Sequence, residues 1–448
     1  MRHLKLKFIL ITGFLLSVIQ VDAQEKEQLR SFLNLALENS HEIKKSKLQI
    51  EGASSQRKEV MAAGLPQVEG GLDYSRMGIP KINIPEDALS GLPEEIAPLL
   101  QGLAGIKAFH TTSASLTVSQ LLYSQQYLTG LKQTKLAEEL YKTLATKTEE
   151  DIIYDVSAGY YRILMSYSNL NMLNNNINNL TKLHNILQLQ YENDFVKQTD
   201  VSRLKVAITN LNTQKESLLN GIKIQERVLK IVMGIDDDSS ALVDTSVVVL
   251  MKYSEPLIVE YQPDALVDYQ LLKKQIELAD MQIKADKATF YPNLAAFGNF
   301  SRSSYGTEFK FEDFTNMNTI GLTAKIPIFS SGTRYQKLTQ SKLKLQESQE
   351  SFEMNRKYLE TGYQNALNSL FSAWMNLKTQ EDNKNLANEV YGQVKLQFDE
   401  GMASLTDLLN VESSLLDSET LFNQQLLSYK LAEIDLLKAT GRIRTLVN

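Results

Sequence analysis

The second half of the chain repeats the first half, and this duplication limits the possible folds more than any other feature. Residues 189–192 (LQYE) match residues 396–399 (LQFD) at a spacing of 207 residues. Further upstream, Pro66 matches Pro292 at a spacing of 226 residues. Because the matches keep their order, they predict two structural repeats with loops of different length. The predicted repeats are residues 24–262 and 263–448.

Each repeat is predicted to contain a helix, a strand pair, a very long helix and a return helix. Proline breaks helix interiors, and the tracts 99–255 and 328–448 contain none, so the long helices belong there. At 1.5 Å per residue such a helix reaches roughly 100 Å. In the first repeat we expect a helix at 26–63, strand pair 67–123 (67–76 and 113–123), long hairpin 125–233 (125–192 and 200–233) and an extended segment at 236–262. In the second we expect a helix at 264–290, strand pair 293–329 (293–302 and 319–329) and long hairpin 333–440 (333–398 and 406–440).

The two return helices carry heptads that are typical of coiled coils. Apolar residues fill eight of ten a and d positions in each helix. In the first they are Val201, Leu204, Ile208, Leu211, Leu218, Ile222, Leu229 and Val232. In the second they are Leu408, Val411, Leu415, Phe422, Tyr429, Ala432, Leu436 and Ala439.

The first residues predict a secretory signal peptide at 1–23. A basic stretch with Arg2, Lys5 and Lys7 precedes an apolar run from residue 8 to residue 19, and Ala23 offers a small residue before the expected cleavage. The chain has no cysteine, so stability must come from packing and assembly. The net charge of −6 and the lack of Lys/Arg blocks argue against nucleic-acid binding.

Enzyme signatures are missing from the sequence. Its four histidines are scattered, and neither a metal-binding HExxH or CxxC pattern nor a GxSxG or phosphate-binding loop occurs. We therefore expect no catalytic residue, no metal and no cofactor.

Four strands per chain cannot close a membrane barrel, which needs eight or more. An open sheet in lipid would leave its edges without hydrogen bonds, so other copies of the chain must complete it, and three copies give twelve strands. The alternation of Ile320 and Leu322 with Thr319, Gly321 and Thr323 suits such a strand. Helices of roughly 100 Å would then project from the membrane as hairpins and enclose a conduit.

Several short motifs resemble, in order, those of the TolC-type outer-membrane efflux proteins. Residues 62–66 (AAGLP) and 289–292 (TFYP), ending at Pro66 and Pro292, resemble the family's passage from helix to strand. Residues 326–332 (IPIFSSG), with Pro327 and Gly332, resemble the passage from strand to helix, and 120–124 (QLLYS) is the first-repeat counterpart. Residues 401–408 (GMASLTDL) resemble the tip of a helical hairpin.

The resemblance implies a mainly α fold with β: a TolC-like chain whose four strands contribute to a trimeric, 12-stranded barrel, continued by coiled-coil hairpins. It implies a homotrimer among outer-membrane lipid in a Gram-negative bacterium, with most of the chain in the periplasm. The expected partners are a periplasmic membrane-fusion adaptor and an inner-membrane pump of the resistance-nodulation-division or ABC type. The expected function is the exit duct of a tripartite efflux or type I secretion system, a passive conduit for a cargo that the sequence leaves open.

The resemblance also assigns roles at the hairpin tips. The adaptor-contact residues would be Asp194, Phe195, Val196, Lys197 and Gln198 in the first tip, and Gly401, Met402, Ala403, Ser404 and Leu405 in the second. The periplasmic entrance would include Asp407, Asn410, Phe398 and Ala403. Asp407 matches the first of two ring aspartates, whereas Asn410, Phe398 and Ala403 replace the family's second aspartate, tyrosine and arginine. Asp194 stands where the family's first tip usually has glycine.

Purely structural interpretations also fit several of these segments. Asp407 is equally well placed to cap its helix, and loop 77–112 is more simply a surface loop than a plug. The asparagine-rich stretch 169–179 is expected to form a polar helix face. Two alternative functions are a coiled-coil periplasmic adaptor and a structural surface protein. An adaptor predicts a single hairpin with flanking lipoyl-like β segments, which the sequence lacks, and a structural protein predicts continuous heptads without the repeated strand pairs.

Overall fold

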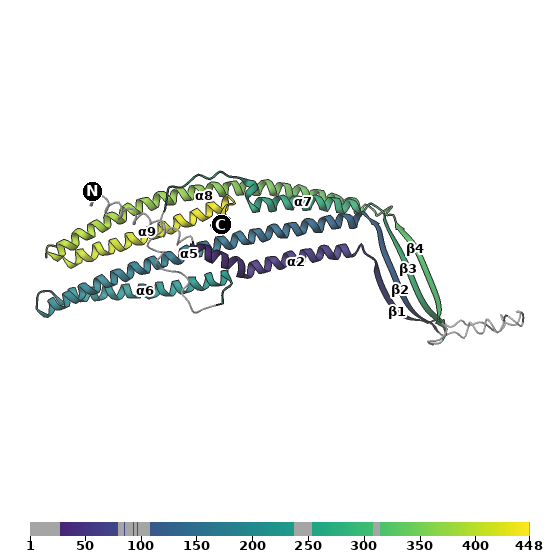
Figure 1. Ribbon diagram of the computed structural model, residues 1–448, viewed down its shortest axis with the longest axis horizontal. Coiled ribbons are helices and arrows are strands. Elements are labelled where there is room, and N and C mark those ends of the chain that lie inside the picture. The colour runs from purple at the N-terminus through teal and green to yellow at the C-terminus, as the bar shows by residue number, and fades with distance from the viewer. Residues whose placement is uncertain are drawn as a thin grey trace, which may run out of the picture. The chain divides into compact units, whose positions relative to one another are not determined.

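The computed structural model describes residues 27–78, 108–236, 253–307 and 314–447, together with Pro85, Pro93 and Ile96 (Figure 1). The predicted signal peptide and nearly all of loop 77–112 lie outside these residues. The chain forms two compact units. One comprises Met1–Ile50, Leu140–Lys274 and Glu350–Asn448, and the other comprises Glu51–Glu139 and Gln275–Gln349.

Helices dominate the first unit and extend into the second. Residues 27–39 are helical. The remaining helices are α2 (His41–Ala62), α5 (Gln125–Glu192), α6 (Gln198–Met233), α7 (Val267–Ala288), α8 (Thr333–Asp399) and α9 (Leu405–Ala439), with short 3-10 turns η2 (Pro263–Ala265) and η3 (Ile443–Leu446). None of the helices within the described ranges has the length and apolarity needed to cross a membrane.

The second unit contains one antiparallel sheet of four strands in the order β1-β2-β3-β4. The strands are β1 (Gln67–Gly78), β2 (Ala108–Ser124), β3 (Asn293–Gly306) and β4 (Thr315–Lys325). The fold class predicted from the sequence is confirmed by the long helical hairpins and this sheet. Strand β4 ends at Lys325 rather than near residue 329, because Pro327 has no N–H with which to continue the ladder.

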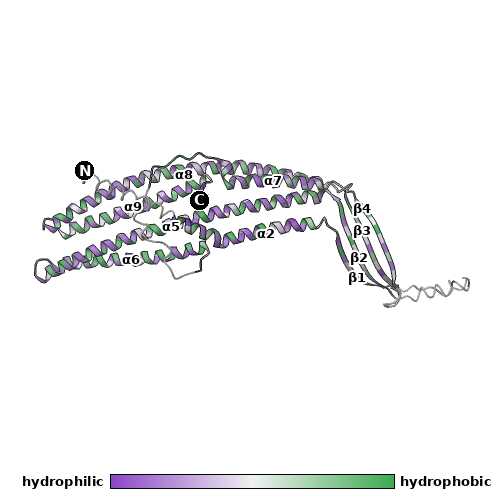
Figure 2. Ribbon diagram, in the orientation of Figure 1, coloured by the Kyte–Doolittle hydropathy of each residue, from purple (hydrophilic) through white to green (hydrophobic). Residues whose placement is uncertain are grey.

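The heptads of the return helix α6 face a core. Val201, Leu204, Leu211, Ile222 and Leu229 are buried, as their a and d positions predict. Buried residues of the first unit form three hydrophobic clusters, and Tyr160, Leu377 and Leu204 are among their most enclosed members. Hydrophilic and hydrophobic residues alternate along the helices (Figure 2).

Two glycines show that the repeats are also equivalent in space. Gly234 and Gly441 lie 207 residues apart, and both have left-handed φ angles, 71° and 70°. A Cβ on Gly234 would lie 2.3 Å from the carbonyl oxygen of Asn39, and one on Gly441 would lie 2.7 Å from that of Ala265. Asn39 and Ala265 are 226 residues apart, which is also the spacing of Pro66 and Pro292. The first contact coincides with the interruption at Ser40 of the helix predicted for 26–63.

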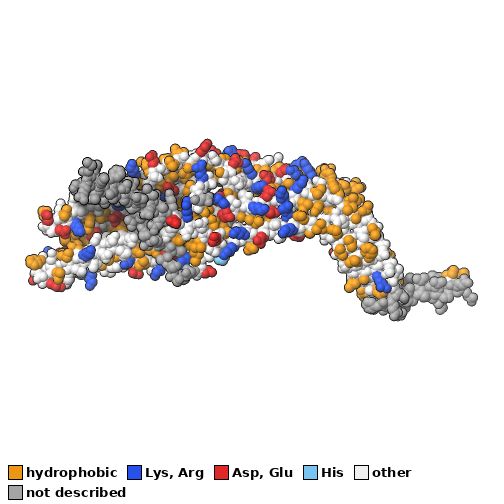
Figure 3. Space-filling model, viewed as in Figure 1, with side chains coloured by type: hydrophobic (Ala, Val, Ile, Leu, Met, Phe, Trp, Pro, Cys, Tyr) orange, Lys and Arg blue, Asp and Glu red, His pale blue; other side chains and the backbone are white. Residues whose placement is uncertain are grey.

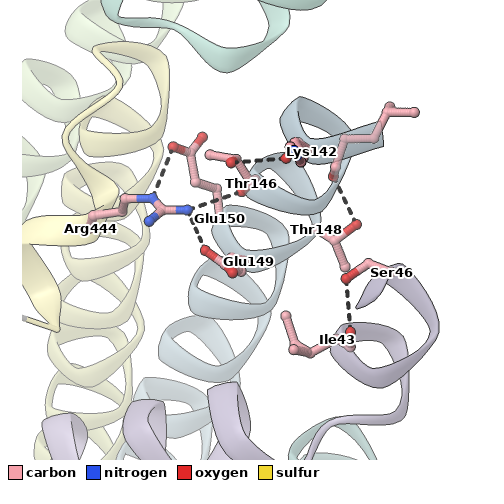
Figure 4. Close-up of polar contacts among 9 residues, drawn as sticks. Ile43, Ser46, Lys142, Thr146, Thr148, Glu149, Glu150 and Arg444 are labelled. Atoms are coloured by element: carbon pink, nitrogen blue, oxygen red, sulfur yellow. Dashed lines mark hydrogen bonds and ion pairs between the residues drawn. The ribbon is translucent and has the colours of Figure 1, made fainter. Parts of the chain in front are cut away.

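Ion pairs and tyrosines tie the chain's irregular segments to the long helices. Near the C-terminus, Arg444 donates to Glu149 and lies 3.6 Å from a carboxylate oxygen of Glu150, both on α5 (Figure 4). Burial raises the pKa of Glu150, and Arg444 opposes that rise. The described part of the predicted extended segment is held through backbone carbonyls: the hydroxyl groups of Tyr429 and Tyr363 donate to residues 254 and 259.

Candidate functional site

The turns at the two hairpin tips have the same backbone geometry. The amide of Phe195 donates to the carbonyl of Gln190 at 2.9 Å, and the equivalent amide of Met402 donates to that of Gln397 at 2.7 Å. Gly401 has a φ of 78° and its counterpart Asp194 a φ of 63°. Asp194 therefore takes the left-handed conformation in place of the family's glycine, which Asp and Asn tolerate better than most residues.

The apex of each turn exposes a large apolar side chain. Phe195 is 81% exposed and Met402 is 71% exposed. The remaining tip residues predicted for the adaptor, residues 194–198 and 401–405, also lie in these turns or at the start of a return helix, and Leu405 alone among them is buried. Their proposed role as an adaptor surface stays a prediction.

Ser404 is the N-cap of helix α9, and Asp407 completes a capping box with it. The Asp407 carboxylate accepts hydrogen bonds from the backbone amide of Ser404 at 3.1 Å and from the Ser404 hydroxyl at 2.6 Å, while the Asp407 amide donates to that hydroxyl at 3.2 Å. These bonds lower the pKa of Asp407, so the carboxylate carries a negative charge at neutral pH. The equivalent start of α6 at Lys197 has no side-chain cap.

The other predicted entrance residues lie on different sides of the second tip. Phe398 packs partly against the cluster that contains Leu405, Ala403 is half-buried and Asn410 is exposed. Arg203 of α6, which the sequence analysis missed, donates from its guanidinium to the Thr406 hydroxyl at 2.7 Å. Arg203 and Asn410 occupy equivalent positions in the two repeats, and both line one groove between the hairpins. No motif distinguishes Arg203 in the sequence.

A polar cavity of about 340 Å³ lies between helices α5, α8 and α9. Asn171, Asn175, Asn176 and Asn179 line it, so the predicted polar face of the asparagine-rich stretch meets this cavity. Glu412 lines the opposite wall and is only 6% exposed. Burial raises its pKa to about 7, although Lys395 acts in the other direction. No sequence motif marks Glu412, because its burial depends on neighbouring helices.

A second carboxyl group lines the same cavity. Burial raises the pKa of Glu419, and Lys384 lowers it. The Lys384 ammonium group also lies 3.8 Å from the centre of the Phe422 ring.

The strand register places mostly apolar side chains on one face of the sheet and mostly polar ones on the other, with Asn316 and Asn318 on the first face and Phe297 and Met317 on the second. Residues that pair directly across strands share a face, and neighbours along a strand alternate. The apolar face carries Val68, Leu72, Tyr74, Ala114, Leu116, Val118, Ala296, Phe300, Ile320 and Leu322. The polar face carries Glu69, Asp73, Ser113, Ser115, Thr117, Asn299, Ser301, Ser303 and Thr319.

The apolar face is open to its surroundings. Leu72 is 87% exposed and Ile320 is 81% exposed. Hydrophobic side chains gather over the strands, whereas Lys, Arg, Asp and Glu gather over the helices (Figure 3). Sheets of water-soluble proteins bury such a face, so this one must contact lipid or another molecule.

The four predicted transition residues lie at the junctions of helices and strands. Pro66 and Pro292 directly precede strands β1 and β3. Pro327 lies between β4 and α8, and its carbonyl accepts a hydrogen bond from Arg334 at 3.1 Å. Gly332 precedes α8 with a φ of 82°.

Comparisons with known proteins identify the same fold. Residues 269–442 match the family model of outer membrane efflux proteins. The Campylobacter jejuni CmeC outer membrane channel is 16% identical, with a TM-score of 0.72 over 93% of this chain and 86% of CmeC. The Vibrio cholerae outer membrane protein VceC is 14% identical, with a TM-score of 0.68 over 93% of this chain and 96% of VceC. The open state of the Neisseria gonorrhoeae MtrE outer membrane channel is 17% identical, with a TM-score of 0.71 over 92% of this chain and 89% of MtrE. No curated protein sequence matches the chain. The family-model match and the shared fold confirm that this chain resembles the TolC-type outer-membrane efflux proteins.

Proposed function

We propose that this protein is the outer-membrane exit duct of a tripartite efflux or type I secretion system in a Gram-negative bacterium. The single observation that carries the proposal is the four-stranded sheet, whose exposed apolar face lies opposite a polar face. In a membrane barrel the first face contacts lipid and the second lines water. The strands contain 11 to 17 residues, and a membrane-crossing strand needs about 9 to 11.

The two outer strands of the sheet support assembly from several copies. Strands β1 and β4 each have one partner strand within the described chain, so the backbone groups along their outer edges lack ladder bonds. Because four is an even number, β4 of one copy runs antiparallel to β1 of the next. Three copies give twelve strands, which is within the range of closed membrane barrels.

The long hairpins suit the periplasmic part of such a duct. Helix α5 has 68 residues and α8 has 67, so each is about 100 Å long. The exposed Phe195 and Met402 offer apolar contacts to a periplasmic membrane-fusion adaptor at the tips. An inner-membrane pump, of the resistance-nodulation-division or ABC type, supplies the energy for export. The duct itself is a passive conduit.

The entrance of the duct is the second tip. In a trimer, three Asp407 carboxylates surround one axis and attract cations. Asn410 adds no charge to this ring. Phe398 and Ala403 cannot form a tyrosine–arginine–aspartate network, and Arg203 with Thr406 joins the two tips instead.

A pair of neighbouring substitutions on one strand tests the proposal. Ile320 lies on the apolar face near the middle of the sheet, and Thr319 lies on the polar face. Arginine on the lipid side near the bilayer centre costs about 2–4 kcal/mol, whereas arginine facing water costs little. We expect Ile320→Arg to reduce the amount of trimer in the outer membrane strongly, and Thr319→Arg to leave assembly and single-channel currents in planar bilayers measurable.

The outcomes separate the alternatives. Equal effects of the two substitutions, together with a monodisperse, folded wild-type monomer in mild detergent, would contradict a membrane barrel. A trimer that assembles in the outer membrane but conducts no ions would contradict the duct.

A further inference from the structure

Three basic side chains interrupt the apolar face near one end of the sheet. Arg76 pairs across from His110, and Arg302 lies on the same face four residue pairs closer to the middle. No Asp or Glu belongs to this face among the paired residues of β1 to β4, because Glu69 and Asp73 point to the polar side. The face therefore has a purely positive charge, confined to the end where β1 and β2 meet the 79–107 connection.

The depth of these residues can be estimated from the strand geometry. From Asn293, at the helix end of β3, to Arg302 are nine steps, or about 30 Å along the strand at about 3.3 Å per residue. With a strand tilt of about 40°, this corresponds to about 23 Å along the membrane normal, close to the apolar band of about 25 Å in outer-membrane barrels. Arg302 therefore lies at the outer boundary of the apolar band, and Arg76 and His110 lie beyond it.

This position removes the usual objection to charge on a lipid-facing surface. Lipid-facing arginine is strongly destabilising at the bilayer midplane but nearly neutral near the interface. At that level the side chains meet lipid headgroups. Arginine binds phosphate through two parallel hydrogen bonds, which makes phosphate the best-suited group there.

The surroundings of the basic residues are shaped for a lipid. Arg76 and Arg302 are exposed, the Arg302 guanidinium lies 5.6 Å from the centre of the Phe314 ring, and a His110 ring nitrogen lies 2.9 Å from the Tyr74 hydroxyl. A groove of about 630 Å³ begins at Arg302 and runs toward the centre of the apolar face. Its lining includes Leu72, Leu116 and Phe300, with Gly70 beside them and the polar Asn316 and Asn318 near Arg302. Space is open above Gly70, where a Cβ would meet no atom within 4 Å.

We propose that this end of the apolar face binds an anionic membrane lipid, with Arg302, and beyond it Arg76 and His110, facing its phosphate-bearing headgroup and an acyl chain in the groove. The inference rests on the proposed function, because it requires the apolar face to contact the bilayer. Charge complementarity selects the occupant: an uncharged apolar partner would gain nothing from the two guanidinium groups, and an acidic protein would not need the apolar groove.

Native mass spectrometry of the full-length protein in detergent provides the test. The probes are dioleoyl phosphatidic acid and dioleoyl phosphatidylcholine, which share acyl chains and differ in headgroup charge. A basic residue near an anionic lipid surface contributes about 1 kcal/mol, so we expect Arg76→Gln and Arg302→Gln each to weaken phosphatidic acid binding about fivefold. Lys325→Gln is the matched control, because Lys325 lies on the polar face at the other end of β4.

Several results would overturn the inference. These are equal binding of the two lipids, unchanged binding in both arginine variants, or equal loss in the Lys325 variant. Displacement of the lipid by millimolar inorganic phosphate would show an anion site without an acyl-chain contribution, which also contradicts it. Failure of the proposed function is recognised separately, since the wild-type protein would then form neither a trimer nor a channel in planar bilayers.

Discussion

The buried carboxyl group of Glu412 makes the stability of the helical unit depend on pH. Burial raises its pKa from 4.5 to about 7, and the described residues form no hydrogen bond or ion pair with it. At about 1.4 kcal/mol for each pKa unit, ionisation of Glu412 in the folded protein costs about 3 kcal/mol per chain. The charged group that acts on it from α8 is Lys395, Tyr391 of α8 is a neutral phenol, and Lys384 and Glu419 also line the cavity. Helix α5 contributes only amide and hydroxyl side chains and Met172.

The direction of the pH effect follows from the raised pKa. Below pH 4.5 the carboxyl group is protonated in both the folded and the unfolded chain, so it costs nothing. Between pH 4.5 and about 7 the unfolded chain loses the proton and the folded chain keeps it, and stability falls as pH rises. Above about pH 7 the loss is complete. We therefore expect Glu412→Gln to stabilise the protein by about 3 kcal/mol at pH 8 and by almost nothing at pH 4.5.

The assay is unfolding of the full-length protein in detergent by guanidinium chloride at several pH values. The single tryptophan, Trp374, packs against a core cluster of the same unit, so its fluorescence reports on the relevant helices. Glu400→Gln, on an exposed glutamate at the second tip, is the control. If the wild type and Glu412→Gln keep the same dependence of stability on pH between 4.5 and 8, the carboxyl group is not buried as described.

Three further predictions concern the end of helix α6 and the two hairpin tips. Gly234→Ala should destabilise the folded protein by at least about 1–3 kcal/mol, since the residue has a left-handed φ and lies against a carbonyl. Gly221→Ala is the control and should be neutral or stabilising, because Gly221 lies in open space within α6. Thermal unfolding of the two variants measures the difference. Ser404→Ala should lower the free energy of unfolding by about 1 kcal/mol without changing ion selectivity. Asp407→Asn should reduce the preference of the channel for cations, measured as the reversal potential under a salt gradient. An unchanged reversal potential would mean that Asp407 acts only in the helix cap. Phe195→Cys, in a chain without cysteine, should cross-link to an adaptor. If cysteines in loop 77–112 cross-link to the adaptor and Phe195→Cys does not, the chain has the opposite orientation in the membrane.

The fold was predictable because its periodic signals are long. Proline-free tracts and heptads continue over many turns, so helix α5 has the bounds that the sequence predicts, Gln125–Glu192. Local interruptions of the helices were harder to predict from the sequence. The interruption at Ser40 accompanies a contact with Gly234, nearly 200 residues away, and no pattern near Ser40 announces it.

The sites were predictable only where a motif marks them. The hairpin tips were located because turn residues interrupt a helical pattern, and the capping role of Asp407 follows from its place in the first turn of α9. Arg203 and Glu412 were missed, because one acts across two hairpins and the other owes its pKa to burial by three helices. The apolar sheet face was only partly visible, since glycine and arginine interrupt the alternation in β1 and β3.

The unequal capping of the two return helices has a consequence for motion at the tips. The first amides of α9 have the Ser404–Asp407 cap as a partner, whereas those of α6 begin at Lys197 without a side-chain acceptor. A missing cap lowers the free energy of local opening by about 1 kcal/mol, so the first turn of α6 should fray about five times as often. Amide hydrogen exchange at residues 199–201 should accordingly be faster than at residues 406–408. The tip of the first hairpin (α5 and α6) is then more mobile than the tip of the second (α8 and α9).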